Sequence, residues 1–152
     1  MKIDLNTVNV QANQLRAKAN SLRDERIALQ SYRQNLNNDW RGQEMIGVNN
    51  FIDNTMSQLL SLSSELDNIA SDVISAGQEV RRQEELAEAM AALGRADANI
   101  ANLRVAFDNA QRHHYENPSS STHSALISAQ NKLNDEINVR NNVAVTVRSL
   151  QP

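Results

Sequence analysis

Two groups of side chains carry functional groups that metal binding or acid–base catalysis would require. The first is acidic: Glu84, Glu85 and Glu88 follow the basic pair Arg81-Arg82, and Glu84 and Glu88 share a helix face. Metal sites in helical bundles also need Glu-x-x-His motifs on other helices, and the sequence has none. We therefore interpret this acidic group as a solvated, charge-paired helix face.

The second group is the three histidines, His113, His114 and His123, which flank the most loop-like segment of the chain, residues 113–121. Adjacent histidines point apart on a helix, so one shared metal ion would require the loop to rearrange. We expect surface histidines here, and we expect no metal or cofactor site in the chain.

Other catalytic constellations are missing from the sequence. It has no cysteine, no Gly-x-Ser-x-Gly motif and no glycine-rich phosphate loop. We expect that the protein is not an enzyme. Its formal net charge of −3 argues against a nucleic-acid-binding protein that relies on positive charge.

The composition indicates an all-α protein. Among 152 residues there are 4 glycines and 2 prolines, too few for the turns of a β protein. Apolar residues make up 40% of the chain, enough for a core. No apolar run is long enough for stable membrane insertion. We expect a helical bundle.

Heptad spacing predicts a first long helix over residues 4–38, with Asp4 as its N-cap. Ala12, Ala19 and Tyr32 widen its apolar stripe. The positions that repeat every seven residues are Val8, Leu15, Leu22, Leu29 and Leu36. A short link, residues 37–42, then leads to a second helix, so we expect an antiparallel hairpin.

The second helix has a longer apolar seam with alternating steps of three and four residues, typical of coiled-coil packing. This seam consists of Met45, Val48, Ile52, Thr55, Leu59, Leu62, Leu66, Ile69, Val73, Ala76 and Val80. Together with the leucines of the first helix, its members Val48, Ile52, Leu59 and Leu66 are the expected interaction residues.

The register slips after Val80, because the next seam residue, Leu86, follows six positions later. The helix either breaks at this slip or continues into the next segment; the sequence leaves both open. A second, shorter hairpin follows, with its last helix starting at Ser121 or Thr122. The expected division is therefore a hairpin over 1–82 and a second over 83–152.

Trp40, the only tryptophan, lies in the link between the long helices, and Gly42 follows two residues later. A tight turn needs a residue without Cβ where the chain and a large ring approach each other, and Gly42 meets this need. The indole can cover the end of the hairpin at Leu36 and Met45. We expect Trp40 to be a partly buried structural residue.

With this motif, Trp40-Arg41-Gly42, residues 1–86 resemble the WXG100 (ESAT-6-like) family of type VII secretion substrates. That family pairs two long helices around a Trp-x-Gly turn and has no leader peptide, and the start of this sequence does not read as a signal peptide. Phe51 and the run 62–70 also resemble the family's second helix. The chain is longer than members of that family, and its extra hairpin is similar to the small helical partners that escort polymorphic toxins.

The resemblance implies a protein secreted by a leaderless route that forms a homodimer, or a heterodimer with a WXG100 or LXG-type protein, and meets a secretion ATPase. The family's Tyr-x-x-x-Asp/Glu export signal is missing, because Leu36 follows Tyr32 and Ser119 follows Tyr115. In family heterodimers a partner can supply that signal.

Two other functions fit the same sequence features. The chain could be a cytoplasmic helical adaptor or chaperone whose Trp-x-Gly is accidental, or a structural coiled-coil component of another bacterial assembly. The two hairpins differ in length and register, so we expect the long hairpin to pack in a dimer rather than to fold onto the short one.

Overall fold

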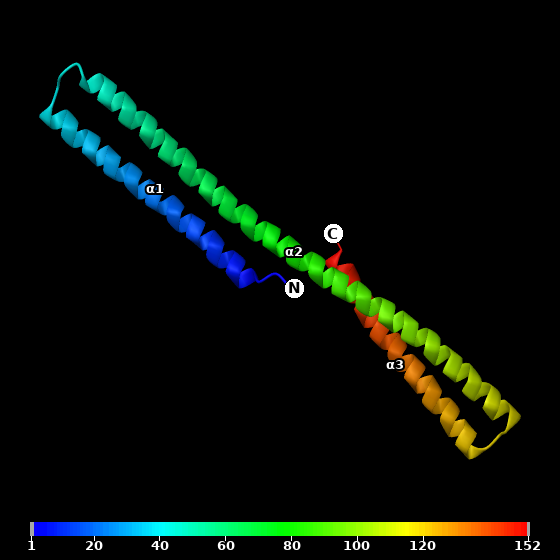
Figure 1. Cartoon of the computed structure of the whole chain (residues 1–152). Coiled ribbons are helices and arrows are strands. Elements are labelled where there is room, and N and C mark those ends of the chain that lie inside the picture. The colour runs from blue at the N-terminus through cyan, green and yellow to red at the C-terminus, as the bar shows by residue number, and fades with distance from the viewer. Residues whose placement is uncertain (1, 152) are drawn as a thin grey trace. The chain divides into compact units, whose positions relative to one another are not determined.

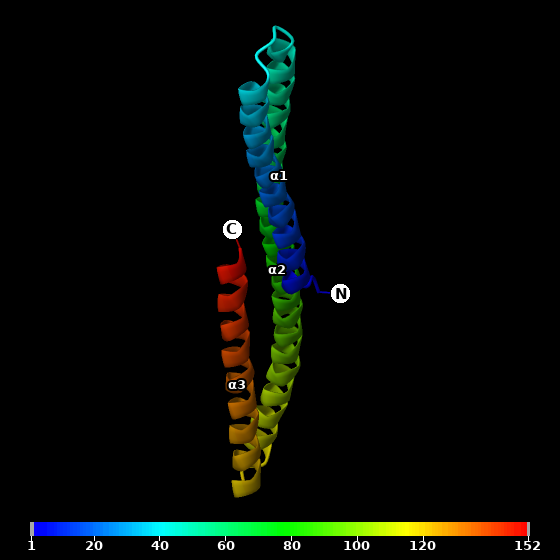
Figure 2. The same ribbon diagram turned by 90° about the vertical axis from the view of Figure 1, so that its left-hand side faces the viewer.

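The computed structural model describes residues 2–151 and confirms an all-α fold of packed helices. The elements are α1 (Leu5–Asp39), α2 (Met45–Glu116) and α3 (Ser120–Leu150), and residues 2–151 contain no strand. α1 runs beside the first part of α2, and α3 runs beside the last part of α2, in both views (Figures 1 and 2). Each pair is an antiparallel hairpin closed by a short loop.

α2 continues without a break through the register slip at Val80, so the chain has one helix of 72 residues where two were possible. The reason is local: residues 78–93 contain neither glycine nor proline and consist mostly of Glu, Gln, Arg, Ala and Leu. These residues are strong helix formers. The contacts nevertheless divide the chain into two compact units, Met1–Arg81 and Arg82–Pro152.

The N-terminus of α1 is capped as the sequence predicted. The Asp4 carboxylate accepts hydrogen bonds from the Asn6 N–H, at 3.0 Å, and from the Thr7 hydroxyl, at 2.6 Å. The hydrogen bond from Thr7 lowers the pKa of Asp4 most, and the one from Asn6 lowers it further. Because the folded-state pKa is depressed, this cap stabilises the helix at neutral pH and is lost as the pH falls through that pKa.

α3 begins earlier than expected. Its N-cap is Ser119, not Ser121 or Thr122. The Ser119 hydroxyl accepts from the Thr122 N–H at 3.1 Å, and the Thr122 hydroxyl accepts from the Ser119 N–H at 3.0 Å. Only a cap at Ser119 places Thr122 at the third helical position, where this reciprocal capping box forms.

The first hairpin packs on small side chains. Ala12 and Ala19 of α1 and Ser63 and Ala70 of α2 have no exposed surface. Gly77, the next residue in the seven-residue row of Ser63 and Ala70, is buried against Val8 of α1. The Ser63 hydroxyl donates to the Leu60 carbonyl at 2.8 Å, which satisfies this fully buried polar group. Small residues on both sides let the two helix backbones approach closely.

The second hairpin also packs on small and branched apolar side chains. Ala96 and Ile100 of α2 and Val147 of α3 are buried. Arg140 of α3 donates through Nε to the Asp97 carboxylate of α2 at 3.0 Å. This ion pair links the two helices of the second hairpin. No helix within residues 2–151 has an apolar stretch that could cross a membrane.

Candidate functional site

The loop that closes the first hairpin positions the Trp-x-Gly motif. α1 ends at Asp39, and Trp40 takes an extended backbone whose N–H still donates to the Leu36 carbonyl at 2.9 Å. The Gly42 carbonyl accepts from the N–H of Met45, the first residue of α2, at 3.1 Å. The motif therefore joins the last carbonyls of one helix to the first amides of the next.

Gly42 is needed for space, not for a special backbone conformation. A Cβ at Gly42 would lie 2.8 Å from Nε1 of the Trp40 indole and in contact with the Glu44 carboxylate. None of the glycines in residues 2–151 has a positive φ. The close approach of ring and chain that the sequence predicted is thus present.

Trp40 is 53% exposed, while Met45 is 4% exposed. About half of the surface of Trp40 therefore remains accessible. A large aromatic ring that is held in place by its own loop and exposed on one side is the kind of anchor that protein interfaces use.

A group of four polar side chains, which we call the clasp, ties the helices together next to this loop. The amides of Asn37 and Asn49 pair reciprocally, at 3.0 and 2.9 Å. Arg33 donates to Asn49 at 3.2 Å and to the Asp53 carboxylate at 2.6 Å. Farther from the Trp40 loop, Arg23 of α1 forms a salt bridge with Asp67 of α2.

Sequence reasoning missed the clasp, although a signal was available. Arg33 continues the seven-residue row of Ala12 and Ala19, and Asn49 continues the row of Ser63 and Ala70. Polar residues at such positions in paired helices fix the register between them. The clasp therefore specifies how the two helices align at the Trp40 end.

The predicted interaction residues differ in their exposure to solvent. Ile52 is 5% exposed. The other predicted interaction residues are half-buried at the edge of the hairpin contact: Leu15, Leu22, Leu29, Leu36, Val48, Leu59 and Leu66. The row that faces α1 most directly is instead Asn49, Ser63, Ala70 and Gly77.

One side of the predicted α2 seam therefore remains at the surface. Leu62 and Ile69, seven residues apart on α2, are 47% and 48% exposed. Val48 is half-buried, and Ala76 is exposed in the same row. We call this row, Val48, Thr55, Leu62, Ile69 and Ala76, the open row. It lies beside the half-buried Leu59 and Leu66, so apolar surface extends along the hairpin on this side.

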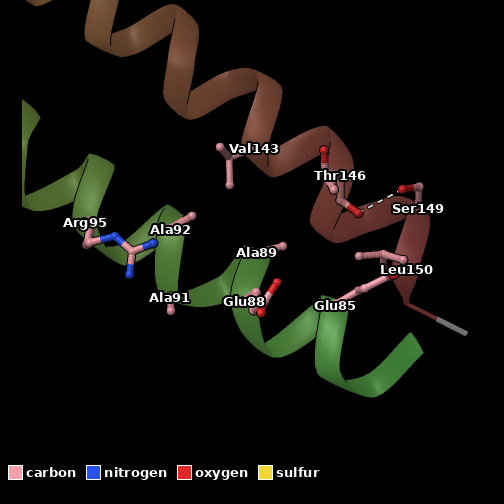
Figure 3. A pocket seen from close by; sticks show the side chains of 10 residues that line it. All are labelled: Glu85, Glu88, Ala89, Ala91, Ala92, Arg95, Val143, Thr146, Ser149 and Leu150. Carbon is pink, nitrogen blue, oxygen red and sulfur yellow. Dashed lines mark hydrogen bonds between the residues drawn. The ribbon is translucent and has the colours of Figure 1, made fainter. Parts of the chain in front are cut away.

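The second hairpin contains an open groove of about 710 Å³ between α2 and α3. Figure 3 shows Ala89 and Ala92 of α2 across from Val143 and Leu150 of α3. The small alanine side chains create the space. The remaining lining residues are Glu85, Glu88, Ala91, Arg95, Thr146 and Ser149.

The acidic residues that the sequence singled out do not gather into a metal site. Within residues 2–151, no group of three or more His, Cys, Asp or Glu side chains is arranged to hold a metal ion. Glu85 and Glu88 lie at the groove in Figure 3, and both take part in other interactions.

Comparison of the chain with protein-family models, curated proteins and solved structures finds no match.

Proposed function

We propose that this chain is a WXG100-like substrate of type VII secretion, or an escort of a toxin exported by that system, and that it acts by forming a helical complex with another protein. The observation that carries the proposal is the place of Trp40-Arg41-Gly42. The motif closes an antiparallel hairpin between the 35-residue α1 and a longer partner helix. Gly42 leaves room for the indole, and the ring is half exposed.

The open row supports a complex as the mode of action. Leu62 and Ile69 are large apolar side chains about half exposed on one side of the hairpin. Contiguous apolar surface on a helix pair is typical of protein interaction sites. A second hairpin that packs on this side would bury the open row and the half-buried leucines beside it, giving a dimer with a second copy or with a WXG100 or LXG-type protein.

Export is tested in the native host. The tagged chain is expected in the culture medium when the secretion ATPase is present and only inside cells when its gene is deleted. Trp40→Ala is expected to abolish export while leaving the helical content unchanged, because Trp40 is 53% exposed and its loss should change stability only modestly.

Tyr32→Ala is the matched control, since Tyr32 is 56% exposed and lies outside the motif. Export should persist in this variant. Immunoblots of medium and cells provide the measurement, with a cytoplasmic marker to exclude lysis. A chain that stays inside cells with an intact ATPase contradicts secretion and favours the intracellular adaptor.

Association is tested separately by light scattering of the purified chain, alone and co-expressed with the product of its neighbouring gene. The paired substitution Leu62→Asp and Ile69→Asp is expected to reduce association at least about 100-fold, because two charges would be buried in an apolar contact. Helical content should be unchanged, since both side chains are half exposed in the hairpin itself.

Ser61→Asp with Asn68→Asp is the matched control, which adds the same charge one position earlier on exposed sites. This variant should associate like the unaltered chain. A monomer of 16.9 kDa that binds no neighbour would contradict the dimer. Equal losses in both variants would place the interface elsewhere on the hairpin.

A further inference from the structure

The loop between α2 and α3 brings two histidines together. His114 lies in the last turn of α2 and His123 in the first turn of α3. Their ring centres are 5.3 Å apart, and the ring planes are tilted by 52°. His113, one residue earlier, is exposed and is not part of this ring contact. The two imidazole rings are therefore in contact in the folded chain, and the loop does not need to rearrange to bring them together.

The 5.3 Å separation fits two imidazoles that share one ion. Zinc binds imidazole nitrogen at about 2.0–2.1 Å with tetrahedral angles, which places the centres of two ligating rings about 5 Å apart. A ring contact alone would allow a wider range, about 4.5–7 Å. Both histidines lie on helices rather than on the loop between them, so their backbones are held in place.

The capping box of α3 places the Thr122 hydroxyl against the His114 ring. Its Nδ1 lies 2.9 Å from the Thr122 hydroxyl oxygen. That hydroxyl has a single proton, and the carbonyl oxygens of Asn117 and Ser119 lie 2.9 and 3.0 Å away to accept it. With its proton on one of these carbonyl oxygens, the Thr122 hydroxyl can accept from Nδ1–H of His114, and in that neutral tautomer the lone pair on Nε2 is free for a metal ion.

This arrangement is the one that metal-binding histidines use. A ligating imidazole typically donates its other ring N–H to an oxygen, which holds the ring in place. Zinc also accepts water as a ligand where the protein supplies fewer than four. With only two histidines the remaining positions would be filled by water, so the site should bind the ion more weakly than sites with three or four protein ligands.

We propose that His114 and His123 form a surface site for a divalent transition-metal ion of the zinc type, with Thr122 as the residue that positions His114. The ion would join the end of α2 to the start of α3 and so hold the second hairpin closed. The site is independent of the type VII proposal, because it uses neither the first hairpin nor the Trp40 loop.

The test is calorimetric titration of the untagged full chain with Zn²⁺ alone. The expected result is one ion per chain. His114→Gln and His123→Gln should each weaken binding at least about tenfold, because one imidazole ligand of two is removed. His113→Gln, the adjacent control, should bind within about twofold of the unaltered chain.

Thr122→Val examines the positioning role. It should weaken zinc binding about tenfold, the lower end of what loss of such a partner costs, and Thr122→Ser should restore it. The imidazole proton and nitrogen NMR signals of His114 and His123 should shift with zinc, and those of His113 should not.

Three results would overturn the site. One is the absence of binding up to millimolar zinc, which would leave a ring contact only. Another is undiminished binding by both His114→Gln and His123→Gln. The third is an equal loss with His113→Gln, which would indicate nonspecific binding to surface histidines.

Discussion

Ile52→Ala is expected to lower the free energy of unfolding of the first hairpin by about 2–4 kcal/mol. Ile52 is 5% exposed, near the clasp on the side of α2 that faces α1. Truncation removes buried methyl and methylene groups and leaves a cavity between two helices that the clasp holds in register. The effect should be large because buried side chains are few in this hairpin and most of them are small.

Phe51→Ala is the matched comparison, one residue earlier on the same helix. Phe51 is 72% exposed, so its loss should change stability by less than about 0.5 kcal/mol, although the side chain removed is larger. Urea unfolding gives the measurement. Trp40, the only tryptophan, lies in the loop of the first hairpin, so its fluorescence reports on this hairpin. Equal losses at Phe51 and Ile52 would contradict the orientation of α2.

Gly77→Ala is expected to destabilise the first hairpin by up to about 2 kcal/mol, although alanine is the better helix former. A Cβ at Gly77 would lie 2.8 Å from Cγ1 and 3.2 Å from Cγ2 of Val8. Valine is stiff about χ1, so its methyl groups cannot swing away without strain. Overpacking of this kind costs about 1–3 kcal/mol and the gain in helix propensity is about 1 kcal/mol, so the net loss of stability is up to about 2 kcal/mol.

Gly94→Ala provides the control, because nothing lies within 4 Å of a Cβ at that position of the same helix. This variant should be more stable by about 0.4–1 kcal/mol. Thermal unfolding by circular dichroism separates the two substitutions by sign. Val8→Ala should relieve the Gly77→Ala defect, so the two changes should be strongly non-additive. If Gly77→Ala stabilises the protein as Gly94→Ala does, α1 does not pack against this face.

Much of the fold follows from local properties of the sequence. The scarcity of glycine and proline, the heptad leucines and the Asp4 cap predicted long helices and the start of α1. The short link around Trp40 predicted the first hairpin. The continuity of α2 was left open, because a register slip changes which face is apolar without weakening the helix itself. Helix propensity across residues 78–93 decides that question, and it favours an unbroken helix.

The sequence alone determined the type and order of the helices, the position of the turn that carries Trp40 and Gly42, and the apolar stripe along α2. Only the tertiary structure decided which half of that stripe meets α1. Hydrophobicity favoured the leucines, but backbones approach most closely where side chains are small. The helices therefore meet at Ala12, Ala19, Ser63, Ala70 and Gly77, and the open row stays at the surface. In the same way, the separation of His114 and His123 depends on where α2 ends and α3 begins. The capping box at Ser119 sets the start of α3, whereas the spacing of residues in the sequence could not specify that start.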